Sequence, residues 1–249
     1  MIEYAEQISH TIMLKVTNLK KRFGDFEAVK GISFEVKQGE VLGFLGPNGA
    51  GKSTTMRMIT GFLPATSGTA AICGHDIASD PVAAKSCLGY LPESAPSYRA
   101  MTVEEYLKFI AEVRGLKVKD AVEKVIAKAK LEKVAKQTIE TLSKGYRQRT
   151  AFAQAIIHDP KVLIMDEPTD GLDPNQKYTV REMIKEMASE KAIVISTHIL
   201  EEVDAVCTRA LIIAGGEIKA DGTPAELRAK DPSGKLDVVF RNLTMQERK

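Results

Sequence analysis

Apolar residues follow two patterns along the chain, and each pattern predicts a different kind of strand. Short continuous apolar runs stand at 41–45, 162–165 and 192–195. Runs of this length are typical of strands that are covered on both faces of a parallel sheet. At 28–36 apolar residues alternate with polar ones, which indicates a half-exposed antiparallel strand. We therefore expect an α/β protein with a mostly parallel sheet and an antiparallel β layer near its N-terminus.

The middle of the chain has a helical pattern. The hydroxyl of Thr102, with a glutamate three positions on, predicts a capped helix start. Apolar residues then recur at helical spacing as far as about residue 158. Further on, the pattern predicts a helix at 174–189, a hairpin at 210–220 and a last helix at 224–229.

These elements predict one domain over residues 1–249. Residues 12–93 and 159–230 would form its core together with the antiparallel β layer. Residues 94–158 would form an inserted α-helical subdomain, and residues 231–249 a short C-terminal tail.

Composition places the chain among ordinary globular proteins. Hydrophobic residues make up 44% and charged residues 27%, and the net charge of +2 gives no reason to expect nucleic acid as a partner. Charge breaks every apolar run well before the length of a membrane helix, and the acidic start at 1–6 lacks the regions of a signal peptide. The cysteines are odd in number and far apart, so we expect reduced thiols in a cytoplasmic protein: Cys73, Cys87 and Cys207.

A glycine-rich stretch at 46–54 carries the strongest chemical signal. It follows the apolar run at 41–45 and precedes a predicted helix, which is the context of a phosphate-binding P-loop rather than of a chance turn. Glycine lets amide N–H groups turn toward an anion, and the helix start adds partial positive charge. We expect Lys52 to neutralise the β- and γ-phosphates and the Ser53 hydroxyl to bind Mg²⁺. The expected nucleotide contacts are Gly46, Pro47, Asn48, Gly49, Ala50, Gly51, Lys52, Ser53 and Thr54.

Two adjacent carboxylates, Asp166 and Glu167, follow the apolar run at 162–165. Ligands of open α/β sheets bind at the carboxyl ends of the strands. Neighbouring strand residues point in opposite directions, so the two acids should have different roles. We expect Asp166 to hold Mg²⁺ opposite Ser53, directly or through water, and Glu167 to align and deprotonate an attacking water. The structural alternative is an acidic turn after a core strand.

A Leu-Ser-x-Gly element, Leu142-Ser143-Lys144-Gly145, stands between these two motifs, and Gly171-Leu172-Asp173 and a lone His198 follow the second of them. This order of motifs resembles the ATPase subunit of ABC transporters over almost the whole chain. Many families have a P-loop, but the Leu-Ser-x-Gly signature at this position separates the chain from kinases, GTPases and RecA-like motors.

The resemblance implies that two cassettes close head to tail, with each ATP between the P-loop of one copy and the signature of the other. Ser143 and Gly145 would then bind a γ-phosphate held by the second copy, although Ser143 could equally cap a helix in a monomer. His198 resembles the histidine that hydrogen-bonds the γ-phosphate and positions Glu167. Asp173 resembles the residue that links the two sites. The catalytic residues would be Glu167, His198 and Lys52.

Other positions resemble the family less closely. Phe23 is similar to the aromatic residue that stacks on adenine, with the alternative that Phe23 or Phe26 is core of the antiparallel layer. Glu93 stands where most members have glutamine, and we expect it to be a ligand of the metal or of water. Lys144 and Tyr146 replace the usual glycine and glutamine of the signature. We expect activity to survive these two changes.

The motifs resemble the ABC-2 type export branch of bacteria. This resemblance implies an ATP-binding and ATP-hydrolysing subunit that uses ATP and Mg²⁺, dimerises with a second copy or a related cassette, and powers separate transmembrane permease subunits. It would be cytoplasmic and peripheral on the inner face of the cell membrane. The main alternative is a non-transport ABC ATPase, such as a soluble scaffold in iron–sulfur assembly. A binding module without turnover is disfavoured because both Glu167 and His198 are present.

Overall fold

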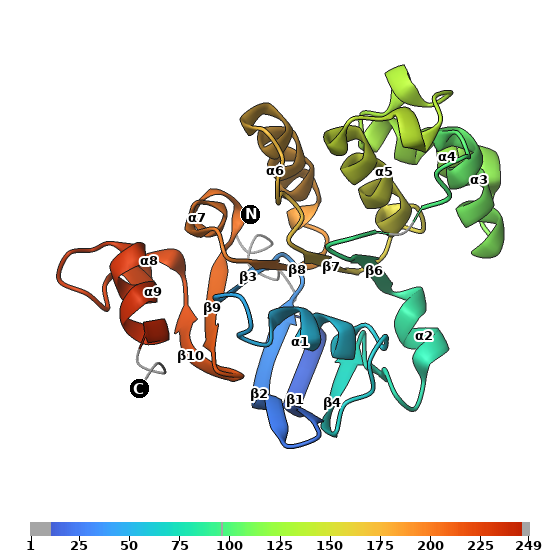
Figure 1. Cartoon of the computed structure of the whole chain (residues 1–249). Helices are drawn as coiled ribbons and strands as arrows, with labels where there is room; N and C mark the ends of the chain where they lie inside the picture. The colour runs from blue at the N-terminus through green and yellow to red at the C-terminus, as the bar shows by residue number, and fades with distance from the viewer. Residues whose placement is uncertain (1–10, 96, 246–249) are drawn as a thin grey trace, which may run out of the picture.

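The computed structural model describes residues 11–95 and 97–245, so the acidic start at 1–6 lies outside the described residues. Two sheets lie side by side in the molecule (Figure 1). The smaller is antiparallel, with the strand order β2-β1-β4-β5. Its strands are β1 (Ile12–Phe23), β2 (Phe26–Lys37), β4 (Ser67–Ile72) and β5 (His75–Asp76).

The larger sheet has the order β10-β9-β3-β8-β7-β6 and is parallel except for the β9–β10 hairpin. Every residue of its three central strands is buried, which explains their continuous apolar sequences. The predicted α/β class with a mostly parallel sheet and an antiparallel layer is confirmed. The strands are β3 (Val41–Leu45), β6 (Leu88–Leu91), β7 (Val162–Asp166), β8 (Ala192–Thr197), β9 (Arg209–Ala214) and β10 (Glu217–Gly222).

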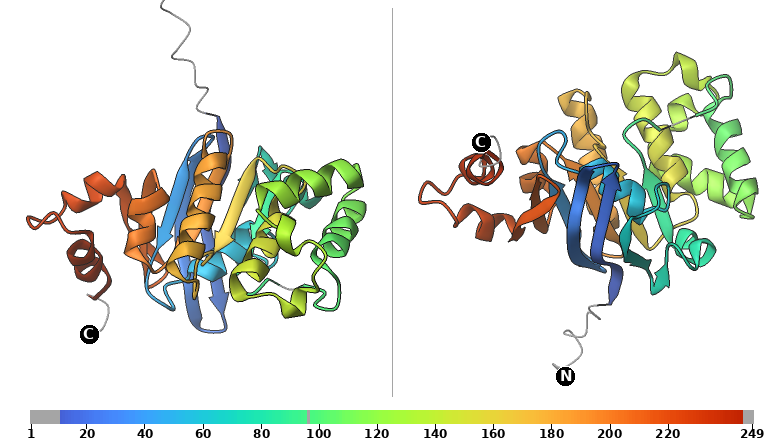
Figure 2. Two further views of the ribbon diagram at one scale, coloured as in Figure 1. Left: turned by 90° about the horizontal axis from the view of Figure 1, so that it is seen from above. Right: turned by 60° about the horizontal axis from the view of Figure 1, so that its bottom comes forward.

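The segment of chain that connects β6 to β7 is helical. Its helices lie at one end of the molecule, on the far side from the C-terminal helices (Figures 1 and 2). Thr102 caps the first of them, because its hydroxyl accepts a hydrogen bond from the Glu105 amide at 3.2 Å and the Glu105 carboxylate accepts one from the Thr102 amide at 2.8 Å. The predicted capping box is therefore confirmed. The elements are α3 (Val103–Val113), α4 (Val118–Lys128), the 3₁₀ turns η1 (Glu132–Val134) and η2 (Ile139–Thr141), and α5 (Lys144–Ile156).

The remaining helices cover the sheets and include one that the sequence analysis missed. We expected the helix at 224–229 to be the last and residues 231–249 to be a tail, and this expectation was wrong. Leu236 and Val239 of α9 are buried in an apolar cluster with Leu227 and Ile212. These helices are α1 (Lys52–Ile59), α2 (Pro81–Ser86), α6 (Pro174–Ala188), α7 (Leu200–Val206), α8 (Pro224–Arg228) and α9 (Leu236–Thr244).

Each helix in the part of the chain that the structure describes is too short or too polar to span a lipid bilayer.

Candidate active site

Lys52 is the first residue of α1 and lies at the carboxyl end of the parallel sheet. Its side chain is only 6% exposed. Its ammonium donates hydrogen bonds to the carbonyls of Gly46 at 2.8 Å and Pro47 at 3.3 Å, and it lies 3.5 Å from the Glu167 carboxylate. A buried cation held mainly by carbonyl oxygens can exchange these partners for phosphate oxygens, so its position fits the predicted role.

Close backbone packing accounts for two of the P-loop glycines, Gly46 and Gly51. Gly51 has a φ of 100°, and a Cβ atom there would lie 2.6 Å from the carbonyl oxygen of Ala28. At Gly46 a Cβ atom would lie 2.5 Å from the carbonyl oxygen of Ile213. Glycine at these positions lets the loop lie directly against β2 and β9 while it turns into α1.

Asp166 is the last residue of β7 and is buried. Its Oδ1 atom accepts a hydrogen bond from the Ser53 hydroxyl at 3.2 Å and another from the Ser196 hydroxyl. Ser196 was not among the predicted site residues, because the register of β7 and β8, which pairs Asp166 with Ser196, appears only in the fold. A hydroxyl and a carboxylate side by side are the oxygen donors that Mg²⁺ prefers, so Ser53 and Asp166 fit the predicted metal.

The side chains of Glu167 and Asp166 contact different groups, as predicted. The reason differs from the prediction: the two side chains point apart because the backbone turns at Glu167, not because they alternate along a strand. Glu167 lies just beyond β7 with a φ of 51°. One of its carboxylate oxygens faces Lys52, and the other is 2.9 Å from Nδ1 of His198. His198 itself follows β8 and is 43% exposed in its side chain.

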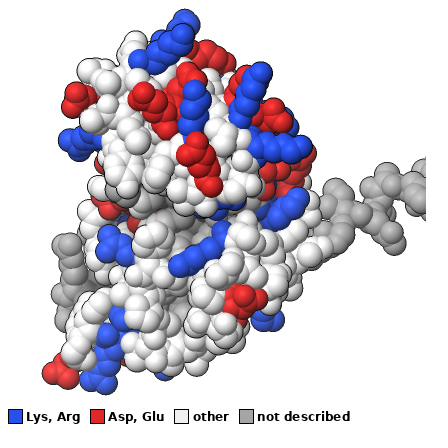
Figure 3. All heavy atoms as spheres, turned by 90° about the vertical axis from the view of Figure 1, so that its right-hand side faces the viewer, with Lys and Arg blue, Asp and Glu red and all other residues white. Residues whose placement is uncertain are grey.

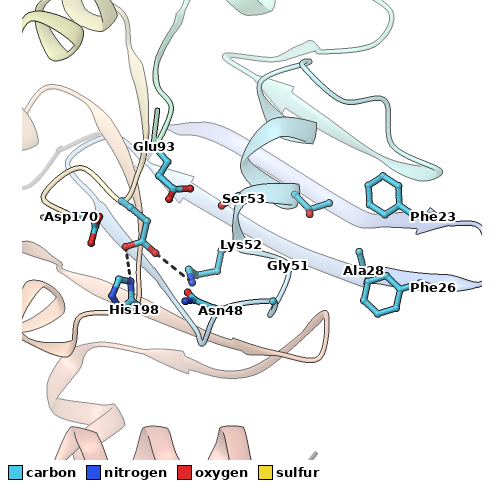
Figure 4. Close-up of a pocket in the computed structure, with 13 residues that line it drawn as sticks. Phe23, Phe26, Ala28, Asn48, Gly51, Lys52, Ser53, Glu93, Asp170 and His198 are labelled. Carbon is cyan, nitrogen blue, oxygen red and sulfur yellow. Dashed lines mark hydrogen bonds and ion pairs between the residues drawn. The ribbon is translucent and has the colours of Figure 1, made fainter. Parts of the chain in front are cut away.

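Lys52, Glu167 and His198 line a cavity of about 570 Å³ (Figure 4). Phe23 and Phe26 stand at one end of it, and Glu93, Asp170 and His198 stand at the other, with the P-loop between them. The two phenylalanines are 49% and 65% exposed, so the alternative that they are core of the antiparallel layer was wrong. The lining residues are Phe23, Phe26, Ala28, Asn48, Gly49, Gly51, Lys52, Ser53, Thr54, Glu93, Glu167, Asp170 and His198.

Ala28 and Asp170 were missed by sequence reasoning. Ala28 carries no chemical signal and enters the cavity only because β2 packs against the P-loop. Asp170 had a local signal, since it lies between the Asp-Glu pair and the Gly-Leu-Asp motif at 171–173. Four predicted site residues near the P-loop are not among the described lining residues: Gly46, Pro47, Ala50 and Asp166.

The predicted residues of the signature and of the motif at 171–173 also lie outside the described lining of this cavity. The Ser143 hydroxyl accepts a hydrogen bond from the Tyr146 amide at 3.4 Å and caps α5, and Asp173 accepts one from the Gln176 amide at 3.0 Å and caps α6. The side chain of Gln176 packs directly on Gly145. The structure therefore brings the P-loop, the two acids and His198 together, and it places the signature elsewhere on the same chain.

Tyr90 is a further titratable group near these acids. Burial raises its pKa to about 12, with a smaller contribution from the charge of Asp166. The phenol thus stays protonated at neutral pH.

Comparisons with known proteins identify the family of the chain. The family model for ABC transporters matches residues 29–170. The linearmycin resistance ATP-binding protein LnrL of Bacillus subtilis (strain 168) is 41% identical over 219 residues, covering 86% of this chain and 70% of the relative. The Nod factor export ATP-binding protein I of Ralstonia nicotianae is 37% identical over 224 residues, covering 88% of this chain and 70% of the relative.

Solved structures of cassettes are also similar. The structure of an ATP-binding subunit of an ABC transporter has a TM-score of 0.83 at 29% identity, over 93% of this chain and 99% of that one. The ADP conformation of another cassette has a TM-score of 0.78 at 26% identity, over 92% and 98% of the two chains. The P-loop, the paired acids and the shared fold lead to one conclusion: the chain belongs to the ABC transporter family and is one of its ATP-binding cassettes, which hydrolyse ATP to power transport.

Proposed function

We propose that this cassette powers a bacterial exporter of the ABC-2 type from the cytoplasmic face of the cell membrane. The names of two relatives support export. One relative is named for resistance to linearmycin, and another is named for Nod factor export. These names favour transport over the alternative of an iron–sulfur assembly scaffold.

The observation that carries the proposed chemistry is the position of the Glu167 carboxylate between Lys52 and His198. Lys52 would bind the β- and γ-phosphates of ATP, and Phe23 would stack on the adenine at the other end of the cavity. Glu167 would orient water for attack on the γ-phosphorus and accept its proton. His198 would hold Glu167 in place and donate a hydrogen bond to the γ-phosphate.

Mg²⁺ is the proposed metal. Ser53 and Asp166 would hold it, because their oxygens are already adjacent, and Glu93 would be a further ligand of the metal or of its water. When bound, Mg²⁺ neutralises charge on the phosphate oxygens.

The proposed active unit is a head-to-tail dimer with a second copy or a related cassette. Ser143, Gly145 and Asp173 are all absent from the described lining of their own chain's cavity. We infer that Ser143 and Gly145 bind the γ-phosphate in the second copy, where the start of α5 adds its partial positive charge. Asp173 would link the two sites.

Transmembrane permease subunits are the proposed partners of the dimer. A second cavity, of about 540 Å³, lies beside β6 and is lined by Arg57, Lys85 and Arg114 as well as by Phe62 and Tyr90. Figure 3 looks onto this side of the molecule and shows basic side chains along the hollow below the helices. The segment after Glu93 begins there, which supports docking of permease segments at this hollow.

The decisive experiment is ATP hydrolysis by the Glu167→Gln variant. The amide keeps the size of the side chain but cannot accept the proton of water, so we expect kcat to fall by about 100-fold or more. ATP binding, measured by fluorescent-analogue titration, should change little. Turnover at the wild-type rate would overturn the proposed role of Glu167.

A further inference from the structure

Glu202 is a buried acid close to the site that the proposed chemistry does not use. It lies in the first turn of α7 and is 2% exposed, whereas the side chain of its neighbour Glu201 is 75% exposed. Burial of a carboxyl group is unfavourable unless hydrogen bonds compensate.

Hydrogen bonds connect Glu202 to the residue before His198 and to the residue after it. The Thr197 hydroxyl donates a hydrogen bond to Glu202 Oε2 at 2.7 Å. The same hydroxyl accepts a hydrogen bond from the amide of Ile199 at 3.0 Å. A hydroxyl can donate once and accept at the same time, so one Thr197 oxygen joins the buried acid to the backbone after His198.

Thr197 is itself completely buried at the end of β8. The residue before His198 is thus fixed by the sheet, and the residue after it is fixed through Thr197 and Glu202. The imidazole of His198 lies between these two fixed residues and is partly exposed, and its Nδ1 atom is 2.9 Å from Oε2 of Glu167.

The charges around Glu202 also connect it to the site. Arg181 and Lys177 of α6 attract its negative charge, and Glu167 repels it. Among the described residues, Oε1 of Glu202 and the Nε and Nη2 atoms of Arg181 are buried without hydrogen-bond partners. The carboxyl group therefore has one strong, specific partner, the Thr197 hydroxyl.

We propose that Glu202 is a positioning residue for His198: through the Thr197 hydroxyl it fixes the backbone turn that keeps the imidazole beside Glu167. This inference rests on the proposed function, because it assigns Glu202 to the hydrolysis step in which His198 and Glu167 act. Glu202 is not among the described residues that line the nucleotide cavity, so its effect passes through Thr197.

ATPase kinetics of full-length variants test the proposal. In Glu202→Ala we expect kcat to fall by about tenfold or more, with KM for ATP within about twofold of wild type, because catalytic geometry changes while the P-loop does not. Glu202→Gln should recover most of the activity, since its amide oxygen can accept the Thr197 hydrogen bond. Glu201→Gln is the matched control and should keep wild-type kinetics.

The Thr197→Val variant tests the connection itself. It should reproduce the loss in kcat, and combination with Glu202→Ala should add little, because the two residues act as one unit. Circular dichroism checks the fold of each variant. If Glu202→Ala does not fold, the loss in Thr197→Val and the recovery in Glu202→Gln decide the question.

A second readout does not depend on hydrolysis. In NMR spectra of histidine-labelled protein, the imidazole signals of His198 should shift or broaden in Glu202→Ala and Thr197→Val, while those of His75 on β5 serve as the internal reference. Unchanged His198 signals together with unchanged kcat would overturn the inference. By contrast, wild-type turnover in Glu167→Gln would overturn the proposed function and leave the NMR comparison intact.

Discussion

Glu167 adopts a backbone conformation that residues other than glycine rarely adopt. Its φ of 51° costs about 1–3 kcal/mol for such a residue. The end of β8 holds it there, because the Glu167 amide donates to the carbonyl of Ser196 at 3.1 Å and lies 3.3 Å from the Ser196 hydroxyl. The strained turn directs the carboxylate away from Asp166 and toward Lys52 and His198, so the strain accompanies the separation of the two acids.

The aromatic end of the cavity leads to a prediction for Phe23. In Phe23→Ala the Kd for ATP should rise by about tenfold, because a stacked ring contributes roughly 1 kcal/mol beyond its buried area. Phe23→Tyr is the matched control and should bind ATP normally. Titration with a fluorescent ATP analogue measures both. An unchanged Kd in Phe23→Ala, with a rise in Phe26→Ala instead, would assign the stacking to Phe26.

Glu202 should also make stability depend on pH. Burial is the main cause that raises its pKa, and the charge of Glu167 adds to it, while Thr197, Arg181 and Lys177 act in the opposite direction. The folded state therefore binds this proton more tightly than the unfolded state, and its contribution to stability is lost as pH rises from 4.5 through the raised pKa.

Urea unfolding at several pH values measures this effect. The free energy of unfolding of wild type should fall relative to that of Glu202→Gln between pH 4.5 and pH 8, by about 1.4 kcal/mol for each unit by which the pKa is raised. Glu201→Gln, which changes an exposed acid, should follow the wild-type pH dependence. A constant difference between wild type and Glu202→Gln would contradict the prediction.

Helix α9 shows how a short segment acquires structure from its neighbours. Leu236, Val239, Phe240 and Leu243 recur at helical spacing and pack with α8 and β9. A helix of nine residues is marginal by itself in water, so this packing is its main source of stability.

Substitutions in α9 test its contribution. Leu236→Ala should lower the free energy of unfolding by about 2–4 kcal/mol, because it removes buried side-chain volume. Asp237→Ala, on the exposed face of the same helix, should change it by less than about 0.5 kcal/mol. Urea denaturation followed by circular dichroism measures both. Equal values for the two variants would mean that α9 does not pack in solution.

The elements that the sequence predicted well are those with strong internal patterns. Runs such as Val162–Met165 identify buried strands because both faces of the central sheet are covered. The strands of the antiparallel sheet extend further than their apolar patterns, since their outer faces are polar and pairing rather than burial sets their ends. The tail at 231–249 was misread because Pro232 and Gly234 precede the helical spacing in α9 and interrupt the chain.

At the scale of the whole molecule, the site also contains residues that the sequence predicts and residues that only the fold reveals. The P-loop and the acid pair could be predicted because each is a short, contiguous stretch of sequence with distinctive chemistry. Ser196 and Ala28 could not, because each reaches the site through the pairing or packing of segments far apart in sequence. Glu202 lies only five residues after Thr197, but neither its burial nor its hydrogen bond to the Thr197 hydroxyl has a signal in the sequence. Local chemistry predicted the reaction, and the fold shows which other residues lie beside the predicted ones.

The basic hollow beside β6 allows the last prediction, on assembly with the permease. Arg57, Lys85 and Arg114 line it, no acidic residue is among its described lining, and these three cations have no ion pair among the described residues. A permease segment that docks there should therefore present a carboxylate beside apolar side chains, since like charges at an interface are unfavourable. In the Lys85→Glu/Arg114→Glu variant, recovery of the permease with the tagged cassette should fall by about tenfold, which corresponds to 1.4 kcal/mol.

The control must change the net charge equally without touching the hollow. Lys124→Glu/Lys128→Glu does so on the exposed face of α4 and should retain the permease. Both double variants should bind ATP as wild type does, because none of the four residues lines the nucleotide cavity. Since an attraction between exposed charges weakens with salt, the wild-type complex should also lose permease as ionic strength rises, whereas the hollow variant should respond less. Equal losses in the two variants would show that overall charge, rather than this hollow, holds the permease.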